Sequence, residues 1–353
     1  MNRAANQTKF RRTALIIVFA IFATISLGQW EGPRLSAFIE GGYNSNPAQL
    51  TSDEITQFGA GDPGWMRLTS TDDALFRAGL SGEYRVRIRE WRVISVIDYR
   101  YNKFLHNSEM DYHFIRPSLM LRKGDFRADA ALAYMPRYAY ALFHDSDFPG
   151  EARFWAEYSM IRGEFEARFD MFDNHSFGIA GQVEYNEYNE NFPEYDGVSF
   201  RVGPSWRWSG PVYLRMHYAY RVYNARGFDI EGHVVETSLK TDISFVEDRI
   251  EGYISRRFYL FSRRALLGAS WRLSRRYYTS EKDFHIDYIH VARRDLRADI
   301  SPFISCDATD RLNIRLGYSF TIRESDSPYF DLKPLKNYAR SMAYLRLEYS
   351  IIR

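Results

Sequence analysis

The sequence predicts an all-β fold, a closed antiparallel up-and-down transmembrane β-barrel of about 14 strands, within a range of roughly 12 to 16. Three observations predict it. Apolar and polar residues alternate with a period of two over long stretches, aromatic residues make up 17% of a polar chain, and the connections alternate between short and long. Soluble strands are usually shorter, at about five or six residues.

Composition excludes several other classes. The chain has 353 residues, 47 Lys+Arg against 45 Asp+Glu, and one cysteine, Cys306. The near-neutral balance gives no electrostatic reason to expect nucleic acid as a partner. A single cysteine rules out an internal disulfide framework and a cysteine-based zinc site. A negative mean hydropathy excludes a polytopic helical membrane protein, which needs repeated apolar runs.

The N-terminus has the three regions of a secretory signal peptide. A basic cluster at Lys9, Arg11 and Arg12 precedes an apolar run over 13–27, and Ser26 and Gly28 stand at −3 and −1 of a cut before Gln29. A single transmembrane anchor is the alternative, but the run is short for a span. We therefore expect a signal peptide over 1–28 and export of the chain, with one barrel domain over 29–353.

The alternation defines the strands. In 76–88, Phe76, Leu80 and Val86 share one face, whereas Arg77 and Arg85 share the other. Candidate strands cover 35–46, 74–88, 93–104, 112–122, 126–138, 154–170, 176–188, 197–208, 212–223, 233–245, 288–306, 311–323 and 338–352. The stretch 249–278 looks like two pieces, and strand parity asks for one, so it is counted once with a bulge or short crossing.

Closure follows from the environment. A sheet in lipid cannot leave edge N–H and C=O groups unpaired, and its outer face must be apolar. Tyr and Trp favour the two interfaces, which accounts for 26 Tyr and 7 Trp. We expect one girdle beside the short turns (Trp91, Phe169, Trp206, Trp208, Phe245) and one toward the long loops (Tyr43, Phe76, Tyr99, Tyr101, Tyr134, Tyr138, Tyr185, Tyr218, Tyr220). A propeller would repeat a blade signature, and a sandwich would use shorter strands.

One segment carries a family resemblance. The first strand, from Phe38 to Pro47, reads FIEGGYNSNP, with a Gly-x-Tyr-Asn-Ser-Asn-like entry. It resembles the opening strand of Gram-negative outer-membrane barrels such as surface-lipoprotein assembly modifiers and β-barrel porins. The resemblance covers about ten residues and implies an outer-membrane location. The assembly modifiers also carry a helical-repeat domain, which this chain lacks, and the terminal aromatic residue common in such barrels is replaced by Arg353.

No catalytic motif stands out. The outer-membrane phospholipase pattern is missing, and His175-Ser176, its nearest fragment, falls on an expected short turn. Gly-x-Ser-x-Gly and His-Glu-x-x-His are absent as well. Acidic loop residues such as Asp53 and Asp326 are expected to solvate their loops, and Cys306 is expected to face lipid as a small apolar residue. The sequence predicts no enzyme, no cofactor and no metal site.

The inner face is the informative feature. The alternation places there, as lumen-lining residues, Arg77, Arg85, Arg87, Arg100, Arg116, Arg122, Arg201, Arg207, Arg215, Arg221, Arg315, Arg323, Arg346, Glu83, Asp98 and Glu348. Basic groups outnumber acidic ones on this face. An open lumen would therefore concentrate anions. The alternative is that arginine–carboxylate pairs brace a narrow or plugged lumen.

Three functions remain open at this point. The first is an outer-membrane channel for small solutes or an anionic polymer, with the basic excess favouring anions. The second is a non-conducting barrel whose outer loops bind a partner or surface glycan. The third is a lipid-modifying enzyme, which needs catalytic residues that converge near the rim. Expected partners are outer-membrane lipid and the barrel-assembly machinery, with anionic solutes or polymer for a channel.

Overall fold

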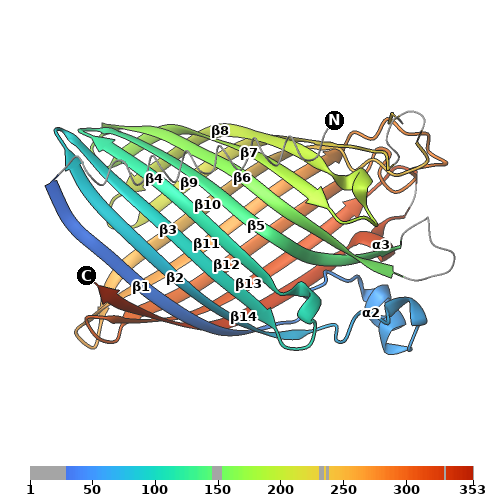
Figure 1. Cartoon of the computed structure of the whole chain (residues 1–353), viewed down its shortest axis with the longest axis horizontal. Helices are drawn as coiled ribbons and strands as arrows, with labels where there is room; N and C mark the ends of the chain where they lie inside the picture. Colours follow the sequence, from blue (N-terminus) through green and yellow to red (C-terminus); the bar gives the residue numbers. More distant parts are fainter. Residues whose placement is uncertain (1–28, 145–152, 230–233, 236–237, 330, 353) are drawn as a thin grey trace.

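The computed structural model describes residues 29–144, 153–229, 234–235, 238–329 and 331–352, and the expected signal peptide lies outside them. The described residues form a closed antiparallel barrel of 14 strands in which each strand pairs with its neighbours in sequence and β1 pairs with β14. Figure 1 shows the steeply tilted strands of this up-and-down barrel. The predicted fold class is confirmed.

The strands are long enough to cross a bilayer when tilted. Their bounds are β1 Gln29–Asn44, β2 Asp73–Ile88, β3 Trp91–Phe104, β4 Tyr112–Lys123, β5 Phe126–His144, β6 Arg153–Phe172, β7 His175–Tyr188, β8 Gly197–Ser209, β9 Tyr213–Ala225, β10 Phe245–Leu260, β11 Arg263–Tyr278, β12 Arg294–Asp307, β13 Leu312–Asp326 and β14 Tyr338–Ile352.

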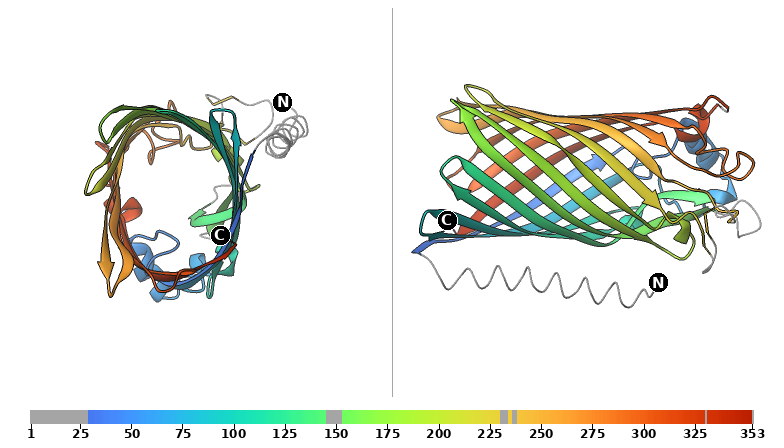
Figure 2. Two further views of the ribbon diagram at one scale, coloured as in Figure 1. Left: turned by 90° about the vertical axis from the view of Figure 1, so that its left-hand side faces the viewer. Right: turned by 90° about the horizontal axis from the view of Figure 1, so that it is seen from above.

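Short turns join the strands at one rim and long loops join them at the other (Figures 1 and 2). Tight turns need backbone with positive φ, and Gly124 (53°) and Asn174 (67°) supply it in two of them. The long loops carry the helices α2 (Ser52–Gly59) and α3 (Lys333–Lys336) and the 3₁₀ turns η1 (Pro63–Trp65), η2 (Ser108–Met110) and η3 (Pro193–Tyr195). Among the described residues, no helix is both long and apolar enough to cross a membrane.

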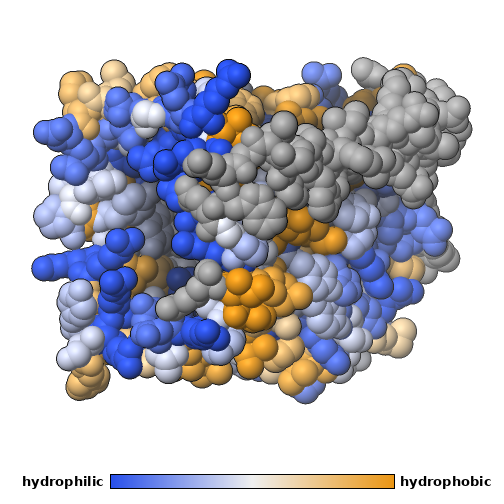
Figure 3. Space-filling model, turned by 60° about the vertical axis from the view of Figure 1, so that its left-hand side comes forward, coloured by the Kyte–Doolittle hydropathy of each residue, from blue (hydrophilic) through white to orange (hydrophobic). Residues whose placement is uncertain are grey.

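The outer wall is apolar. Leu80, Phe200, Leu267, Leu316 and Leu345 point outward, with between 48% and 57% of their surfaces exposed. Figure 3 shows hydrophobic side chains gathered on the visible outer wall, beside a hydrophilic rim at the short-turn end. Such an exposed belt is stable only against hydrocarbon. Cys306 lies in this outer face, where it pairs with Ala265 and Ile314.

Two strand assignments were wrong. One strand too many was assigned before β10 and one too few within 249–278, so the total of 14 is unchanged. The described residues 234–235 and 238–244 form no strand and lie in the connection before β10, held by bonds such as those from Ser244 to the carboxylate of Asp242. The stretch 249–278 forms most of two strands that are joined at Phe261 and Ser262, whose φ values are 49° and 62°. Gly and Asn usually mark such a turn, so Phe-Ser gives no sequence signal for it.

Two girdle residues were also misplaced. Phe245 lies inside the barrel at the long-loop end, where its ring stacks on Tyr223 at 5.2 Å. No short turn follows Phe245, because β10 continues from Phe245 to Leu260. Tyr138 packs inward against Tyr112 and Tyr158, because an irregularity in β5 after Met135 shifts its alternation.

Candidate functional site in the barrel lumen

All 16 residues predicted to line the lumen alternate with the exposed apolar residues of the outer wall and lie on the inner face. Nothing in the structure tests whether they act on a solute, so that role stays a prediction. Solvent reaches this face, since Arg100 on β3 is exposed and the side chain of Arg215 on β9 is 41% exposed. The inner wall therefore encloses water-accessible space.

Carboxylates organise most of the inner arginines. Glu166 on β6 contacts three guanidinium groups, from Arg207 at 2.7 Å, Arg215 at 3.3 Å and Arg168 at 3.4 Å. Glu184 on β7 bridges Arg221 at 3.0 Å and Arg162 at 3.2 Å. The pairs of Glu166 with Arg207 and of Glu184 with Arg221 join strands that are not adjacent in the sheet, so they brace the wall.

Several members of this network were absent from the predicted set. Glu247 contacts Arg276 at 3.1 Å and Arg249 at 3.4 Å, and the nearest Arg249–Glu251 contact is 3.9 Å. Glu247, Arg249 and Glu251 were missed because Phe245 was placed beside a short turn, so the strand through 245–255 was not recognised. The charged residues at 247, 249 and 251 recur with a period of two, and this spacing was the signal that could have found them. Glu40 on β1, which pairs with Arg77 at 2.6 Å, was also missed.

A second group of inner arginines has no carboxylate partner. Within the described part of the chain these are Arg100, Arg122, Arg201, Arg315 and Arg340. Arg100 and Arg315 lie over aromatic rings instead, 5.6 Å from the Phe114 centroid and 4.5 Å from the Phe303 centroid. An unpaired guanidinium projects more field into the lumen than one whose charge a carboxylate cancels.

The lumen narrows at the long-loop end because the β5–β6 hairpin leaves the wall. The pairing of β4 with β5 stops at Ile115 and Tyr134, and two register irregularities follow in β5, the first across Pro136. The pairing of β6 with β7 stops at Tyr158. Beyond these points the hairpin is free to bend, and Figure 2 shows its end inside the barrel outline in the end-on view.

Loop 45–72 packs against this hairpin and thickens the obstruction. Trp65, which is 1% exposed, joins Leu50, Leu142 and Trp155 in one apolar cluster. The guanidinium of Arg153 lies 4.0 Å from the Trp65 ring centroid. Thr51 caps α2 in the same loop through a reciprocal pair of bonds with Glu54. The loop is therefore a folded part of the mouth.

A lysine faces the hairpin from across the mouth. Lys336 in α3 lies with its Nζ 5.3 Å from the ring centroid of Phe143 in β5, although α3 and β5 belong to distant parts of the barrel. Burial, reinforced by Arg293 and Arg323, lowers the pKa of Lys336 to about 7. Burial likewise lowers the pKa of the nearby His290. The narrowest part of the lumen thus carries a lysine that titrates near neutral pH.

Comparisons with known proteins add little to this geometry. No protein-family model and no curated protein matches the chain. Among solved structures, it is similar to OccAB1 of Acinetobacter baumannii (9% identity, TM-score 0.45, covering 93% of this chain and 100% of that one). A bacterial polysaccharide outer membrane secretin is similar to the same degree (9% identity, TM-score 0.45, covering 90% of this chain and 98% of that one). OpdK of Pseudomonas aeruginosa has 10% identity and a lower TM-score of 0.40, covering 92% of this chain and 100% of that one. At these TM-scores the likeness carries no argument.

Proposed function

We propose that the protein is an outer-membrane channel that admits small solutes and prefers anions. The observation that carries this proposal is a water-accessible inner wall on which arginines outnumber carboxylates and some guanidinium groups have no acidic partner. The apolar outer belt and the closed sheet support a membrane location. The alternation of short turns with long loops is typical of outer-membrane barrels.

The two kinds of arginine serve different purposes in this mechanism. Paired arginines, such as those around Glu166, hold strands of the wall together and contribute little net field. Unpaired arginines such as Arg100 and Arg340 attract an anion through their field, and Arg340 also offers a planar pair of donors for a carboxylate or phosphate. An anion can therefore exchange between them without displacing an internal carboxylate.

Reversal potentials across a planar bilayer, measured with a salt gradient, test the proposal. The purified barrel should conduct, with chloride more permeant than potassium. The double variant R100Q/R340Q should lose about half or more of that preference, since each unit charge acts over several ångströms. The matched control is R77Q/E40Q, which removes an ion pair of 2.6 Å without changing the net charge. A cation-selective wild-type barrel would contradict the proposal.

A second function is favoured by one feature, the obstruction of the mouth by the β5–β6 hairpin and loop 45–72. If these segments seal the lumen, the barrel acts as a binding protein through its loops. An electrically silent protein that remains folded in the bilayer would favour this alternative. No observation on the described residues favours a lipid-modifying enzyme.

A further inference from the structure

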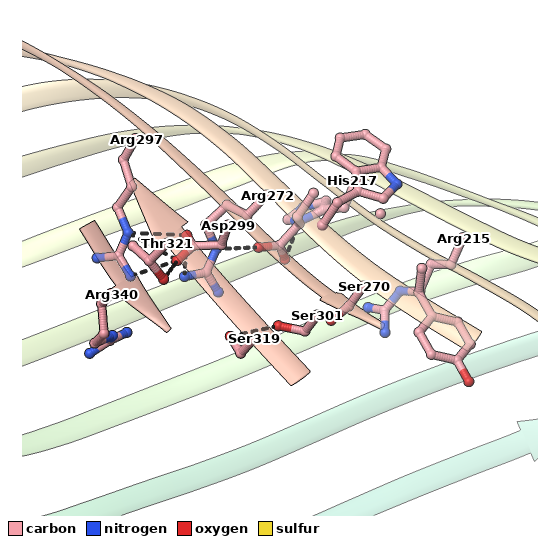
Figure 4. A pocket seen from close by; sticks show the side chains of 14 residues that line it. Arg215, His217, Ser270, Arg272, Arg297, Asp299, Ser301, Ser319, Thr321 and Arg340 are labelled. Atoms are coloured by element: carbon pink, nitrogen blue, oxygen red, sulfur yellow. Dashed lines mark hydrogen bonds and ion pairs between the residues drawn. The ribbon is translucent and has the colours of Figure 1, made fainter. Parts of the chain in front are cut away.

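A hollow in the inner wall lies between β9 and β14, below the constriction. Its volume is about 400 Å³, and its lining includes Arg215, Tyr253, Ser270, Ser301, Ser319 and Arg340. In Figure 4 the three serines lie in a row between the two arginines. The hollow is thus a row of hydroxyl groups with a cation at either end.

Strand register explains why the wall is hollow here. Tyr253 pairs with Arg215 on one side and Ser270 on the other, Ser270 pairs with Ser301, and the Ser301 hydroxyl donates to that of Ser319 at 2.9 Å. These residues therefore form one continuous row of paired positions across the wall. Serine is small, whereas the inner rows on either side contain larger side chains, so the row recedes from the axis.

The row toward the long loops is charged. Arg272 lies within 3.8 Å of Asp299, Asp299 accepts a 2.7 Å bond from Thr321, and Thr321 pairs with Arg340. Arg340 itself has no carboxylate partner among the described residues. The hollow is therefore bounded on this side by an ion network that ends at Arg340, a guanidinium without a carboxylate partner among the described residues.

The row toward the short turns is aromatic. Gly268 and Gly317 leave room for rings, since a Cβ would lie 2.6 Å from the Phe303 ring at Gly268 and 2.2 Å from the Tyr344 ring at Gly317. The rings of Phe303 and Tyr253 are stacked, with centroids 6.2 Å apart. Of these rings Tyr253 lines the hollow, whereas Phe303 is covered by Arg315, whose guanidinium lies 4.5 Å from the ring centroid, so the hollow has one ring on this side and hydroxyl groups along its back.

We infer that this hollow binds a sugar acid, a solute with one carboxylate and several hydroxyl groups. The inference rests on the proposed function, because solute reaches the hollow through the lumen. The carboxylate pairs with Arg340 or Arg215, the sugar hydroxyls bond to the serine row, and a C–H face lies on an aromatic ring. An aromatic acid would leave the serine hydroxyls without partners, and a neutral sugar would leave Arg340 without a counter-charge.

Calorimetry of the whole barrel in detergent tests the inference directly, with D-glucuronate as the probe. D-glucose, acetate and benzoate each lack one part of the chemistry, so glucuronate should bind about tenfold more tightly than any of them. S270L places a larger group in the hollow at an exposed position, and R340Q removes the cation. Each should weaken glucuronate binding by about tenfold or more.

The matched control is R100Q, which removes another unpaired inner arginine, on β3 and away from the hollow. It should leave glucuronate binding within about twofold of wild type, a free-energy change well under the 1.4 kcal/mol of a tenfold effect. Equal losses in R100Q and R340Q would show diffuse attraction and overturn the inference, as would equal binding of glucose or no binding at all. Retained cooperative unfolding confirms that S270L is folded. If S270L misfolds, R340Q against R100Q decides the result alone.

Conductance measured on the same preparation separates the two claims. A conducting barrel that does not bind glucuronate overturns the sugar-acid site and leaves the channel intact. A silent barrel that binds glucuronate with the expected variant pattern overturns the channel and leaves the site.

Discussion

We predict that Lys336 makes the proposed anion preference depend on pH near neutrality. Its pKa of about 7 follows from burial and from the nearby Arg293 and Arg323, against which Glu54 and Asp295 act in the opposite direction. Below this pKa the side chain is protonated and adds a positive charge to the constriction, and above it the charge is lost. Anion selectivity should therefore be higher at pH 6 than at pH 8.

The size of the step follows from Coulomb's law. An ion that passes about 5 Å from the ammonium group, similar to its 5.3 Å separation from Phe143, interacts with it by about 0.8 kcal/mol in water. Screening at 0.15 M salt leaves about half of this. Because the anion and cation terms have opposite signs, they differ by about 0.9 kcal/mol, which is about a fourfold change in the permeability ratio.

Reversal potentials recorded between pH 6 and pH 8 measure this step. K336M keeps the side-chain length, removes the charge, and should remove most of the step while it keeps the channel open. His290 is expected to contribute less than Lys336, because burial lowers the pKa of its imidazole below the ordinary value. A wild-type ratio that does not change with pH, or an undiminished step in K336M, would refute the reasoning.

Three further outcomes are expected. W65A should release loop 45–72 from its apolar cluster and raise single-channel conductance; an unchanged conductance would show that this loop does not limit the lumen. E166Q, which leaves three guanidinium groups without their shared carboxylate, should lower the free energy of unfolding by about 3 kcal/mol in a urea titration, and a midpoint within error of wild type would contradict it. G181A should cost about 1–3 kcal/mol, because its Cβ would lie 2.2 Å from the Phe165 ring, whereas the neighbouring G163A has no atom within 4 Å and should cost less; equal effects would remove the packing argument.

The wall of the barrel could be predicted from the sequence because its cause is local. Successive side chains of each strand face lipid and lumen in turn, so the residues next to Leu316 and Arg315 in the sequence are enough to predict which side each one faces. The failure at 233–278 has the same origin. A turn made of Phe261 and Ser262 carries no glycine or asparagine to mark it, so the two strands that it joins were counted as one. One strand was also assigned wrongly to the connection before β10, so the total number of strands was still correct.

The constriction could not be predicted in this way, because it depends on contacts between distant segments. Lys336 faces Phe143, which lies 193 positions earlier in the sequence. Trp65 packs in the same cluster as Trp155, which lies 90 positions later. Alternation within a strand relates neither pair. One local signal was present. Pro136 cannot donate to a β-ladder, so a proline inside an expected strand indicates a bulge, and the bend of β5 begins there.

The field inside the barrel arises from the placement of charges and not from their number. The whole chain has a net charge of +2, and residues 1–28 contain Arg3, Lys9, Arg11 and Arg12 but no acid. The remaining chain is therefore net negative, although arginines predominate on its inner wall. The excess of carboxylates must then lie away from the inner wall, and water screens those in the loops and turns. The low-dielectric wall screens the inner arginines less, so we expect a chain with a negative total to present a positive lumen to a solute.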